Sequence, residues 1–306
     1  MHPDRRKHTE AINRLATDGQ WEEVYRRIML EEFGHEARMG WQLAFLRPFC
    51  APRMARILVA SGNIVQQPLK RAYDTGLIIY EIVYNGLDSP AGRKMVSLMN
   101  RAHHGRSIVD EDMTYVLCAF IVAPYRYMSW TGWRRLTDID RQASLEFYRR
   151  MGRLMNIKTM PGSYQEAEQI LDDYEARYVV PNDDARLLGE NLIKVLKGRL
   201  PGPAKPIATP LFTAFIDDAR ISRALGYTPL PRPAQAVVRG LGRLYGLVQA
   251  QLPYETKPVF TPGNKAGKAY PHGYTLDDLG PDGIPDEATL TPQSQTETHE
   301  PDPTAR

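Results

Sequence analysis

Residues 99–117 read MNRAHHGRSIVDEDMTYVL, with two adjacent histidines that are followed by a glycine and then by an acidic cluster. Apolar residues recur at helical spacing on both sides of this stretch. Gly105 is typical of a residue that ends a helix, and Asp110 is typical of one that caps the start of the next. The stretch therefore predicts two consecutive helices, and it raises the question of whether either histidine binds a ligand.

The composition is that of an ordinary globular protein. The chain has 306 residues, of which 42% are hydrophobic and 25% are charged, and this suits one large or two modest domains. Its 39 basic and 36 acidic residues are interspersed and give a net charge of +3. Because no basic patch stands out, we expect no nucleic-acid partner.

The cysteines and the apolar segments indicate where the protein works. Cys50 and Cys118 are far apart and lack the spacing of metal ligands, so neither a disulfide framework nor a zinc site is expected. The N-terminus has no apolar run after its basic residues, as a secretory signal would require. The apolar segments are too short to form a transmembrane helix. We therefore expect a cytoplasmic protein.

The spacing of apolar residues is helical almost throughout, and strictly alternating stretches are scarce, so we predict an all-α fold. Three predicted helices start with a capping side chain, at Ser89, Thr137 and Ser163. Pro124 is expected to stop the helix that begins at Asp110, and Gly34 is expected to end the helix over residues 21–33. The predicted helices cover residues 21–33, 42–47, 53–61, 70–84, 90–103, 110–123, 138–155, 164–178, 184–197, 208–225 with an interruption, and 233–252.

The composition divides the chain into three parts. Residues 1–20 form a charged N-terminal extension, and residues 21–255 form a single compact multi-helix domain. Residues 256–306 are rich in Gly, Pro, Thr, Asp and Glu, and such a segment buries too little apolar surface to offset its ordering entropy. We expect a largely disordered C-terminal tail, of which Tyr270–Gly280 packs back on the body.

The two histidines fall on different faces of the helix that precedes Gly105. A helix turns by about 100° per residue, which places His103 on the stripe of Met95 and Met99, and His104 on the polar side. A histidine on an apolar stripe is commonly a core residue that hydrogen-bonds a backbone carbonyl. His104 is explained as a cation at a helix C-terminus. Of the two, His103 is the candidate ligand, against the alternative of a core residue.

The preceding helix has a similar interruption of its apolar stripe. Arg71 and Thr75 continue the stripe of Ile78 and Ile82 at its N-terminal end. Burying a guanidinium costs several kcal/mol unless it meets an anion or a rigid acceptor. A nearby carboxylate or contact with water would satisfy Arg71, and so would a carboxylate on a bound cofactor or substrate. Thr75 could hydrogen-bond a bound oxygen species or an ordered water.

Two further clusters offer metal-binding chemistry. Glu32 and His35 have the spacing of a di-iron helix motif, but this motif needs a second pair, and the body of the chain offers none. Asp110, Glu111 and Asp112 could supply carboxylates to a metal, although acidic residues in the first turn of a helix are common. A di-iron carboxylate oxygenase is therefore the less favoured alternative.

Several segments, taken in order, resemble a known family. They are Arg71-x-x-x-Thr75, LMNRAHHG (98–105), DEDMTYVLCAFIVAP (110–124), GWRRLTDIDRQASLEFYRRMGRLMNI (132–157) and PGSY (161–164). Their order and spacing resemble the oxygenase family that includes latex-clearing proteins (rubber oxygenases) and the side-chain-cleaving oxygenase of the mycophenolic acid pathway. The resemblance is closer to the second branch and extends over most of the chain.

This resemblance implies a compact all-α fold that encloses one haem b. It implies that His103 binds the iron, and that Arg71 and Thr75 lie on the distal side, where oxygen reacts and where Arg71 also contacts the cofactor. Rubber oxygenases carry a lysine immediately before this threonine, whereas this chain has Asp74. A resting state closed by that lysine is therefore not expected, and rubber is a poor candidate for the substrate.

The implied function is a haem-b-dependent oxygenase that uses molecular oxygen to cleave or oxygenate an apolar, isoprenoid or unsaturated carbon chain. In such an enzyme the cofactor supplies the redox step, while the protein binds, orients and polarises. The alternative is a non-catalytic helical protein of the same fold that binds haem or lipid. An apolar substrate is also compatible with peripheral contact to a membrane.

Overall fold

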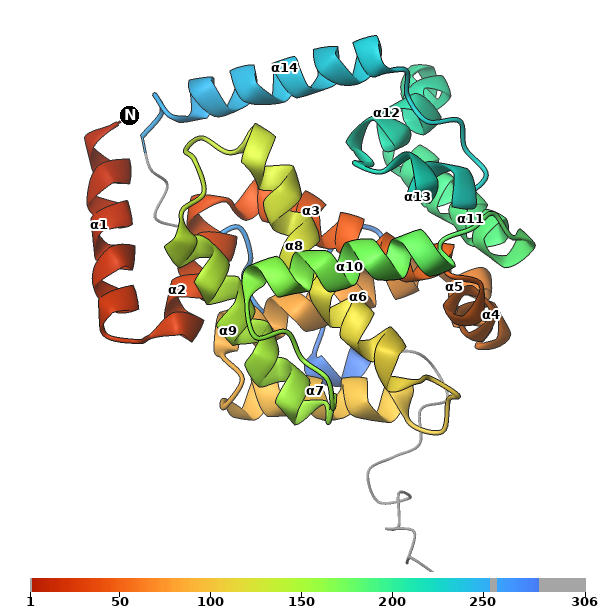
Figure 1. The fold of residues 1–306 in the computed structure, drawn as a ribbon, viewed down its shortest axis with the longest axis horizontal. Coiled ribbons are helices and arrows are strands. Elements are labelled where there is room, and N and C mark those ends of the chain that lie inside the picture. The colour runs from red at the N-terminus through yellow and green to blue at the C-terminus, as the bar shows by residue number, and fades with distance from the viewer. Residues whose placement is uncertain (1, 254–257, 281–306) are drawn as a thin grey trace, which may run out of the picture.

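The computed structural model describes residues 2–253 and 258–280, and it is built from helices (Figure 1). Within these residues there is no β-strand, only two isolated bridges between residues 266 and 273. The predicted all-α fold is confirmed. The helices are α1 (Pro3–Thr17), α2 (Trp21–Arg27), η1 (Ile28–Glu32), α3 (Gly34–Leu46), η2 (Arg47–Cys50), α4 (Pro52–Ala60), α5 (Asn63–Gln66), α6 (Pro68–Asn85), α7 (Pro90–His103), α8 (Asp110–Thr131), α9 (Asp138–Leu154), α10 (Tyr164–Tyr178), α11 (Asp183–Arg199), η3 (Gly202–Ile207), α12 (Ala208–Phe215), α13 (Ala219–Ala224), α14 (Arg232–Gln249) and η4 (Leu276–Asp278).

Helix α8 is the centre of the packing. It contacts α3 most extensively and also packs against α9, α10 and α14 (Figure 1). Most of its side chains are buried, as expected for a helix that is apolar on nearly all sides. None of the described helices combines the length and the apolar character that a bilayer-crossing segment needs.

The prediction that Pro124 stops this helix is wrong, because α8 continues to Thr131. A proline inside a helix costs about 3 kcal/mol or more, but packing offsets this cost here. Gly40 of α3 lies so close to Pro124 that a Cβ on the glycine would come within 2.5 Å of the proline Cα. Tyr125 and Met128, beyond the proline, are buried.

Two other predicted boundaries also differ from the structure. The helix expected over residues 21–33 is divided into α2 and a π-helical turn, and Gly34 starts α3 instead of ending a helix. Asp110 is the first residue of α8, and Val109 is its N-cap. The Asp110 carboxylate instead accepts hydrogen bonds from the backbone N–H groups of Lys158 (2.7 Å) and Thr159 (3.0 Å).

The predicted helix starts at Ser89, Thr137 and Ser163 are confirmed. Ser89 accepts a hydrogen bond from the backbone N–H of Gly92 at 2.9 Å. Thr137 and Asp140 form a reciprocal capping box at the start of α9. Local side-chain chemistry therefore decides where these helices begin.

Helix α1 and residues 258–280 both pack on the body. Ile12 of α1 is buried in the main core, so part of the segment predicted as an extension is helical. Residues 258–280, here called the C-terminal strap, bury Phe260, Tyr270 and Tyr274. This includes the predicted packing of Tyr270–Gly280, and the packed region begins earlier, at residue 258. The rest of the predicted tail lies outside the described residues.

The C-terminal strap is attached to α6 through buried carboxylates. Tyr270 donates a hydrogen bond to Asp74, and Tyr274 donates one to Glu81 at 2.6 Å. Lys70 forms an ion pair with Asp74 at 2.9 Å. These contacts occupy the side of α6 that carries Asp74 and Glu81, and they leave the side with Arg71 to face the interior.

Candidate functional site

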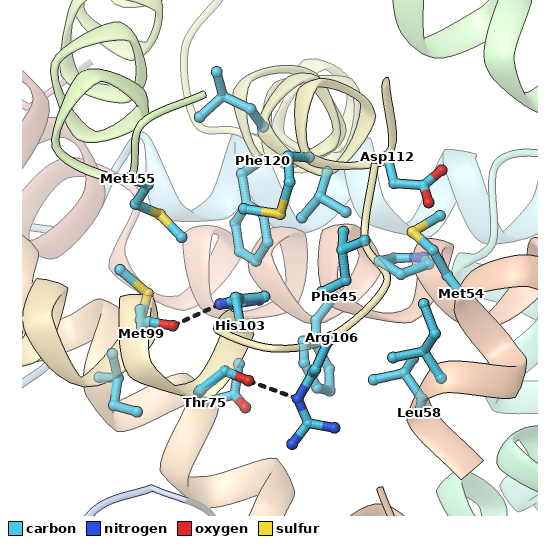
Figure 2. Close-up of a pocket in the computed structure, with 18 of the residues that line it drawn as sticks. Phe45, Met54, Leu58, Thr75, Met99, His103, Arg106, Asp112, Phe120 and Met155 are labelled. Atoms are coloured by element: carbon cyan, nitrogen blue, oxygen red, sulfur yellow. Dashed lines mark hydrogen bonds between the residues drawn. The ribbon is translucent and has the colours of Figure 1, made fainter. Parts of the chain in front are cut away.

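A cavity of about 200 Å³ lies between α4, α6, α7, α8 and α9 (Figure 2). Its wall is mainly apolar, with many methionine, isoleucine, leucine and phenylalanine side chains. The polar side chains on the wall are few, namely those of Ser61, Arg71, Thr75, His103, Arg106 and Asp112. An apolar cavity with a few converging polar groups is typical of a small-molecule or cofactor site.

His103, the last residue of α7, projects into this cavity (Figure 2). Its Nδ1 lies 2.6 Å from the carbonyl oxygen of Met99. A carbonyl oxygen only accepts hydrogen bonds, so Nδ1 carries the proton and Nε2 keeps a free lone pair. The hydrogen bond is the one expected of a core histidine, but the ring borders open space. This tautomer is also the one in which Nε2 can bind a metal.

The surroundings of His103 favour the neutral imidazole. Burial is the main cause that lowers the pKa of His103, and the hydrogen bond to Met99 opposes it. The positive charges of Arg71 and Arg106 lower this pKa further. Because only the neutral ring can bind a metal ion, these effects favour ligation. His103 and His104 are both exposed at the end of α7, although the helical stripe predicted that only His104 would be. They differ in that His103 lines the cavity and His104 does not.

Arg71 and Thr75 also line this cavity, and they lie one turn apart on α6. Arg71 Nη1 donates a hydrogen bond to Thr75 Oγ1 at 2.7 Å, and Thr75 Oγ1 donates one to the Arg71 carbonyl oxygen at 3.1 Å. Burial lowers the pKa of Arg71, and the negative charge of Asp74 compensates in part. Within the described residues no carboxylate forms an ion pair with Arg71. The guanidinium therefore retains donors for a ligand in the cavity.

Arg106, which follows α7, also lines the cavity and was not predicted from the sequence. Its Nε donates a hydrogen bond to the carbonyl oxygen of Ala102 at 2.7 Å (Figure 2). Like Arg71, it has no ion pair within the part of the chain that the structure describes. The positive φ of Gly105, +69°, turns the chain back after α7. Two guanidinium groups without carboxylate partners therefore border one cavity, which suits an anionic group.

Asp112 closes one edge of the cavity but is fully engaged by other side chains. Arg53 donates to both of its carboxylate oxygens, at 2.7 Å and 2.5 Å, and the hydroxyl of Tyr174 donates to one of them at 2.5 Å. Asp110 binds backbone N–H groups instead. The acidic cluster at the start of α8 therefore stabilises the wall, and its members do not converge on a common point.

The alternative di-iron pair does not come together as a site. Glu32 is buried in an ion pair with Arg134 and accepts a hydrogen bond from Thr9 at 3.0 Å, whereas His35 is exposed. Over residues 2–253 and 258–280, no three His, Cys, Asp or Glu side chains form a group that could hold a metal ion. The arrangement at the cavity is of a different kind, because one imidazole, two guanidinium groups and a hydroxyl line a mainly apolar space.

Comparisons with known proteins agree with the resemblance seen in the sequence. A family model described as "ER-bound oxygenase mpaB/B'/Rubber oxygenase, catalytic domain" matches residues 33–248. The chain is 26% identical to the ER-bound oxygenase mpaB' of Penicillium brevicompactum, over 84% of this chain and 76% of that protein. It is also 26% identical to the ER-bound oxygenase mpaB of Penicillium roqueforti, over 69% of this chain and 76% of that protein. The family match includes α6, α7 and α8, which surround the cavity.

Proposed function

The chain belongs to the mpaB/rubber oxygenase catalytic-domain family, and from this premise we propose that it is a haem-b-dependent oxygenase of apolar carbon chains. The proposed reaction is oxidative cleavage or oxygenation of an isoprenoid or unsaturated chain, with molecular oxygen as co-substrate. The observation that carries the proposal is the free Nε2 of His103 in an apolar cavity that Arg71 and Thr75 also line.

The chemical character of the side chains around the cavity suits a haem. His103 offers one neutral nitrogen, which is the usual protein ligand of haem iron. The apolar side chains of α4, α8 and α9 suit the faces of a porphyrin and an apolar substrate. Arg71 and Arg106 offer donors to anionic groups such as the propionates of haem. Bound haem would supply the one-electron and oxygen chemistry that these amino-acid side chains lack.

The roles of the protein groups follow from their positions. His103 would hold the cofactor in place, and the Met99 carbonyl would fix the orientation of the ring. Arg71 would stabilise negative charge that develops on oxygen in the transition state. Thr75 accepts a hydrogen bond from Arg71 and would orient the guanidinium, and its hydroxyl could serve the oxygen only by leaving the Arg71 carbonyl. The apolar wall would exclude water and orient the hydrocarbon chain.

The buried thiols are consistent with a reducing location, and we place the protein in the cytoplasm. Cys50 and Cys118 are both buried and unbonded, and burial raises the pKa of the Cys118 thiol to about 12. Reduced thiols persist in the cytosol. The relatives are named as ER-bound, and a cytoplasmic protein that takes an apolar substrate could work at the outer surface of such a membrane.

The absorption spectrum of the protein, expressed with haem supplied, tests the cofactor. We expect a Soret band that His103→Ala weakens strongly, because the axial ligand is lost. His104→Ala is the matched control, since His104 is the neighbouring histidine and does not line the cavity, and it should keep the band. Wild-type protein without a Soret band would contradict the proposal, and so would equal losses in the two variants.

Oxygen uptake with unsaturated and isoprenoid substrates separates catalysis from mere binding. Arg71→Ala should lower turnover by about 100-fold, the usual effect of removing one donor that stabilises transition-state charge. The haem content should fall much less than in His103→Ala, because His103 and Arg106 remain. Wild-type protein that binds haem but consumes no oxygen with any member of a broad panel would favour the non-catalytic alternative.

A further inference from the structure

Helix α14 exposes a continuous row of large apolar side chains. Val237, Leu241, Leu244, Leu247 and Val248 are each between 51% and 65% exposed, and we call these five residues the outer face of α14. In a helix they fall within one half of the circumference, since each residue advances by about 100°. Scattered exposed apolar residues are normal, but a contiguous apolar patch marks an interaction surface.

The opposite side of α14 is already used for packing on the body. A Cβ at Gly242 would lie 2.6 Å from the ring of Trp130, and one at Gly246 would lie 2.5 Å from the carbonyl oxygen of Gly132. The small residues therefore fix α14 against α8 at close range. In Figure 1 the helix lies along an edge of the molecule, with α1 near one end and α12 near the other. The outer face is thus held outward by the fold itself.

The charges of α14 are all positive. Arg232, Arg239 and Arg243 are exposed, and their spacing of seven and four residues places them in one row beside the outer face. No Asp or Glu occurs between residues 232 and 252. Within the described residues these arginines form no ion pair. A rigid apolar strip with a row of unpaired arginines along its border is the pattern of a helix that lies in a membrane interface.

We propose that α14 docks the protein on an anionic lipid surface, with its axis parallel to the membrane. The five residues of the outer face enter the boundary between headgroups and acyl chains, while the three arginines contact lipid phosphates and carboxylates. This inference is independent of the proposed oxygenase function, because it depends on α14 alone and not on the cavity.

Other occupants of the outer face fit less well. A second copy paired through the same face would bring two sets of arginines together with no acidic residue on the helix to balance them. Residues 281–306 contain only two large aliphatic residues, Ile284 and Leu290, which are too few to cover five side chains. A lipid surface supplies both the negative charge and the apolar phase.

Sedimentation of the full-length protein with lipid vesicles tests this proposal. We expect binding to vesicles of phosphatidylcholine mixed with phosphatidylserine, weaker binding to phosphatidylcholine alone, and a decrease at high salt because the charges are screened. Leu241→Gln/Leu247→Gln should weaken binding by at least about tenfold. Arg239→Gln/Arg243→Gln should weaken binding to the anionic vesicles by about 30-fold.

The control replaces two exposed apolar residues away from α14. Leu154 and Val180 are 44% and 48% exposed, so Leu154→Gln/Val180→Gln removes a similar apolar surface and should leave vesicle binding unchanged. Thermal melting of each variant checks that the fold is intact. The proposal would be overturned if the wild-type protein did not bind anionic vesicles at low salt, or if the control variant lost as much vesicle binding as the α14 variants. A dimer in light scattering that Leu241→Gln/Leu247→Gln converts to a monomer would assign the face to a second copy instead.

Discussion

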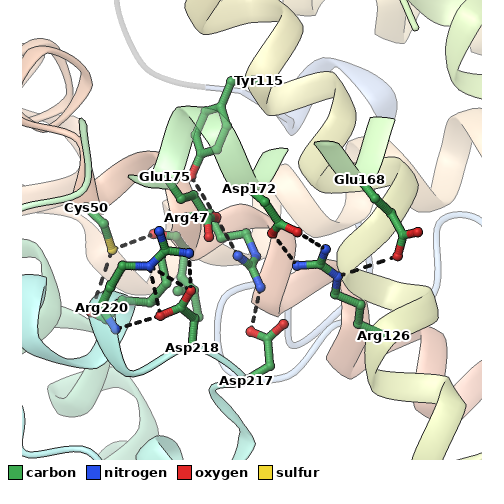
Figure 3. Close-up of polar contacts among 12 residues, drawn as sticks. Arg47, Cys50, Tyr115, Arg126, Glu168, Asp172, Glu175, Asp217, Asp218 and Arg220 are labelled. Atoms are coloured by element: carbon green, nitrogen blue, oxygen red, sulfur yellow. Dashed lines mark hydrogen bonds and ion pairs between the residues drawn. The ribbon is translucent and has the colours of Figure 1, made fainter. Parts of the chain in front are cut away.

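Arg47 and Arg71 lie in two different regions of this molecule, and both are largely withdrawn from water, but their partners differ. Arg47, at the end of α3, is 1% exposed and forms ion pairs with Glu175 and Asp217 (Figure 3). Tyr115 donates a further hydrogen bond to Glu175 at 3.2 Å. Arg71, at the cavity, has no such partner within the residues that the structure describes.

The pKa of each guanidinium reflects these surroundings. Burial alone would lower the pKa of Arg47, but the negative charges of Asp217 and Glu175 outweigh it and raise this pKa. At Arg71 burial prevails, and the pKa is lowered. Arg47 therefore completes the fold, because it joins η2 to α10 and to the chain before α13. Arg71 is only partly satisfied by the fold, which is what a site that awaits an anionic or polar ligand requires.

Stability measurements on matched variants should show the largest difference between the two arginines. Arg47→Met leaves Glu175 buried without its cation, so we expect the free energy of unfolding to fall by about 3–5 kcal/mol. Arg71→Met removes a buried charge that has no ion pair, so we expect a change within about 1 kcal/mol or a gain. Urea denaturation without added haem measures both. Equal losses in the two variants would mean that Arg71 is as structural as Arg47.

The contacts of the C-terminal strap with α6 explain why Arg71 remains unpaired, and they can be broken separately. Asp74 lies on the same helix as Arg71 but is bound by Tyr270 and Lys70 on the other side. Tyr270→Phe removes one of these donors from a buried carboxylate, and we expect a loss of about 1–3 kcal/mol in the free energy of unfolding. Tyr84→Phe, on the same helix, is the control for loss of a tyrosine hydroxyl. A loss no larger than in the control would show that the strap does not fix Asp74.

Local features of the fold could be read from the sequence because they depend on neighbouring residues. The caps at Ser89 and Thr137 were predicted correctly, since each forms within one turn of its helix. Pro124 and Gly34 misled the prediction for the same reason. The helix continues through Pro124 because α3 packs closely against α8 at this point. At Gly34, the start of α3 is contacted by the Val259 side chain of the C-terminal strap. Contacts between distant segments override local preference.

For the candidate site, the sequence could predict which residues share a helix face, but not which residues from turns and distant segments join them. The stripe positions of His103, Arg71 and Thr75 follow from helical periodicity, and the structure does place all three on one cavity. Arg106 lies in the turn after α7, where no period applies, and the turn at Gly105 decides its direction. Nor could the sequence show that Asp74 pairs with Tyr270, which is 196 residues away.

His8 offers a smaller test of the same principle, that burial and neighbouring charges together set the pKa of a group. Burial, followed by the positive charges of Arg27 and Arg134, lowers the pKa of His8 from 6.5 to about 4. Between these two pH values the unfolded chain takes up a proton that the folded chain does not. The contribution of His8 to stability is therefore present above pH 6.5 and is lost as the pH falls toward 4. Between pH 7 and pH 5 we expect the free energy of unfolding to fall by about 1–2 kcal/mol.

His8→Gln should remove this part of the pH dependence, whereas His35→Gln, at an exposed histidine, should not. Urea denaturation at both pH values measures the effect, and an unchanged pH dependence in His8→Gln would show that the folded protein takes up the proton despite the arginines around it.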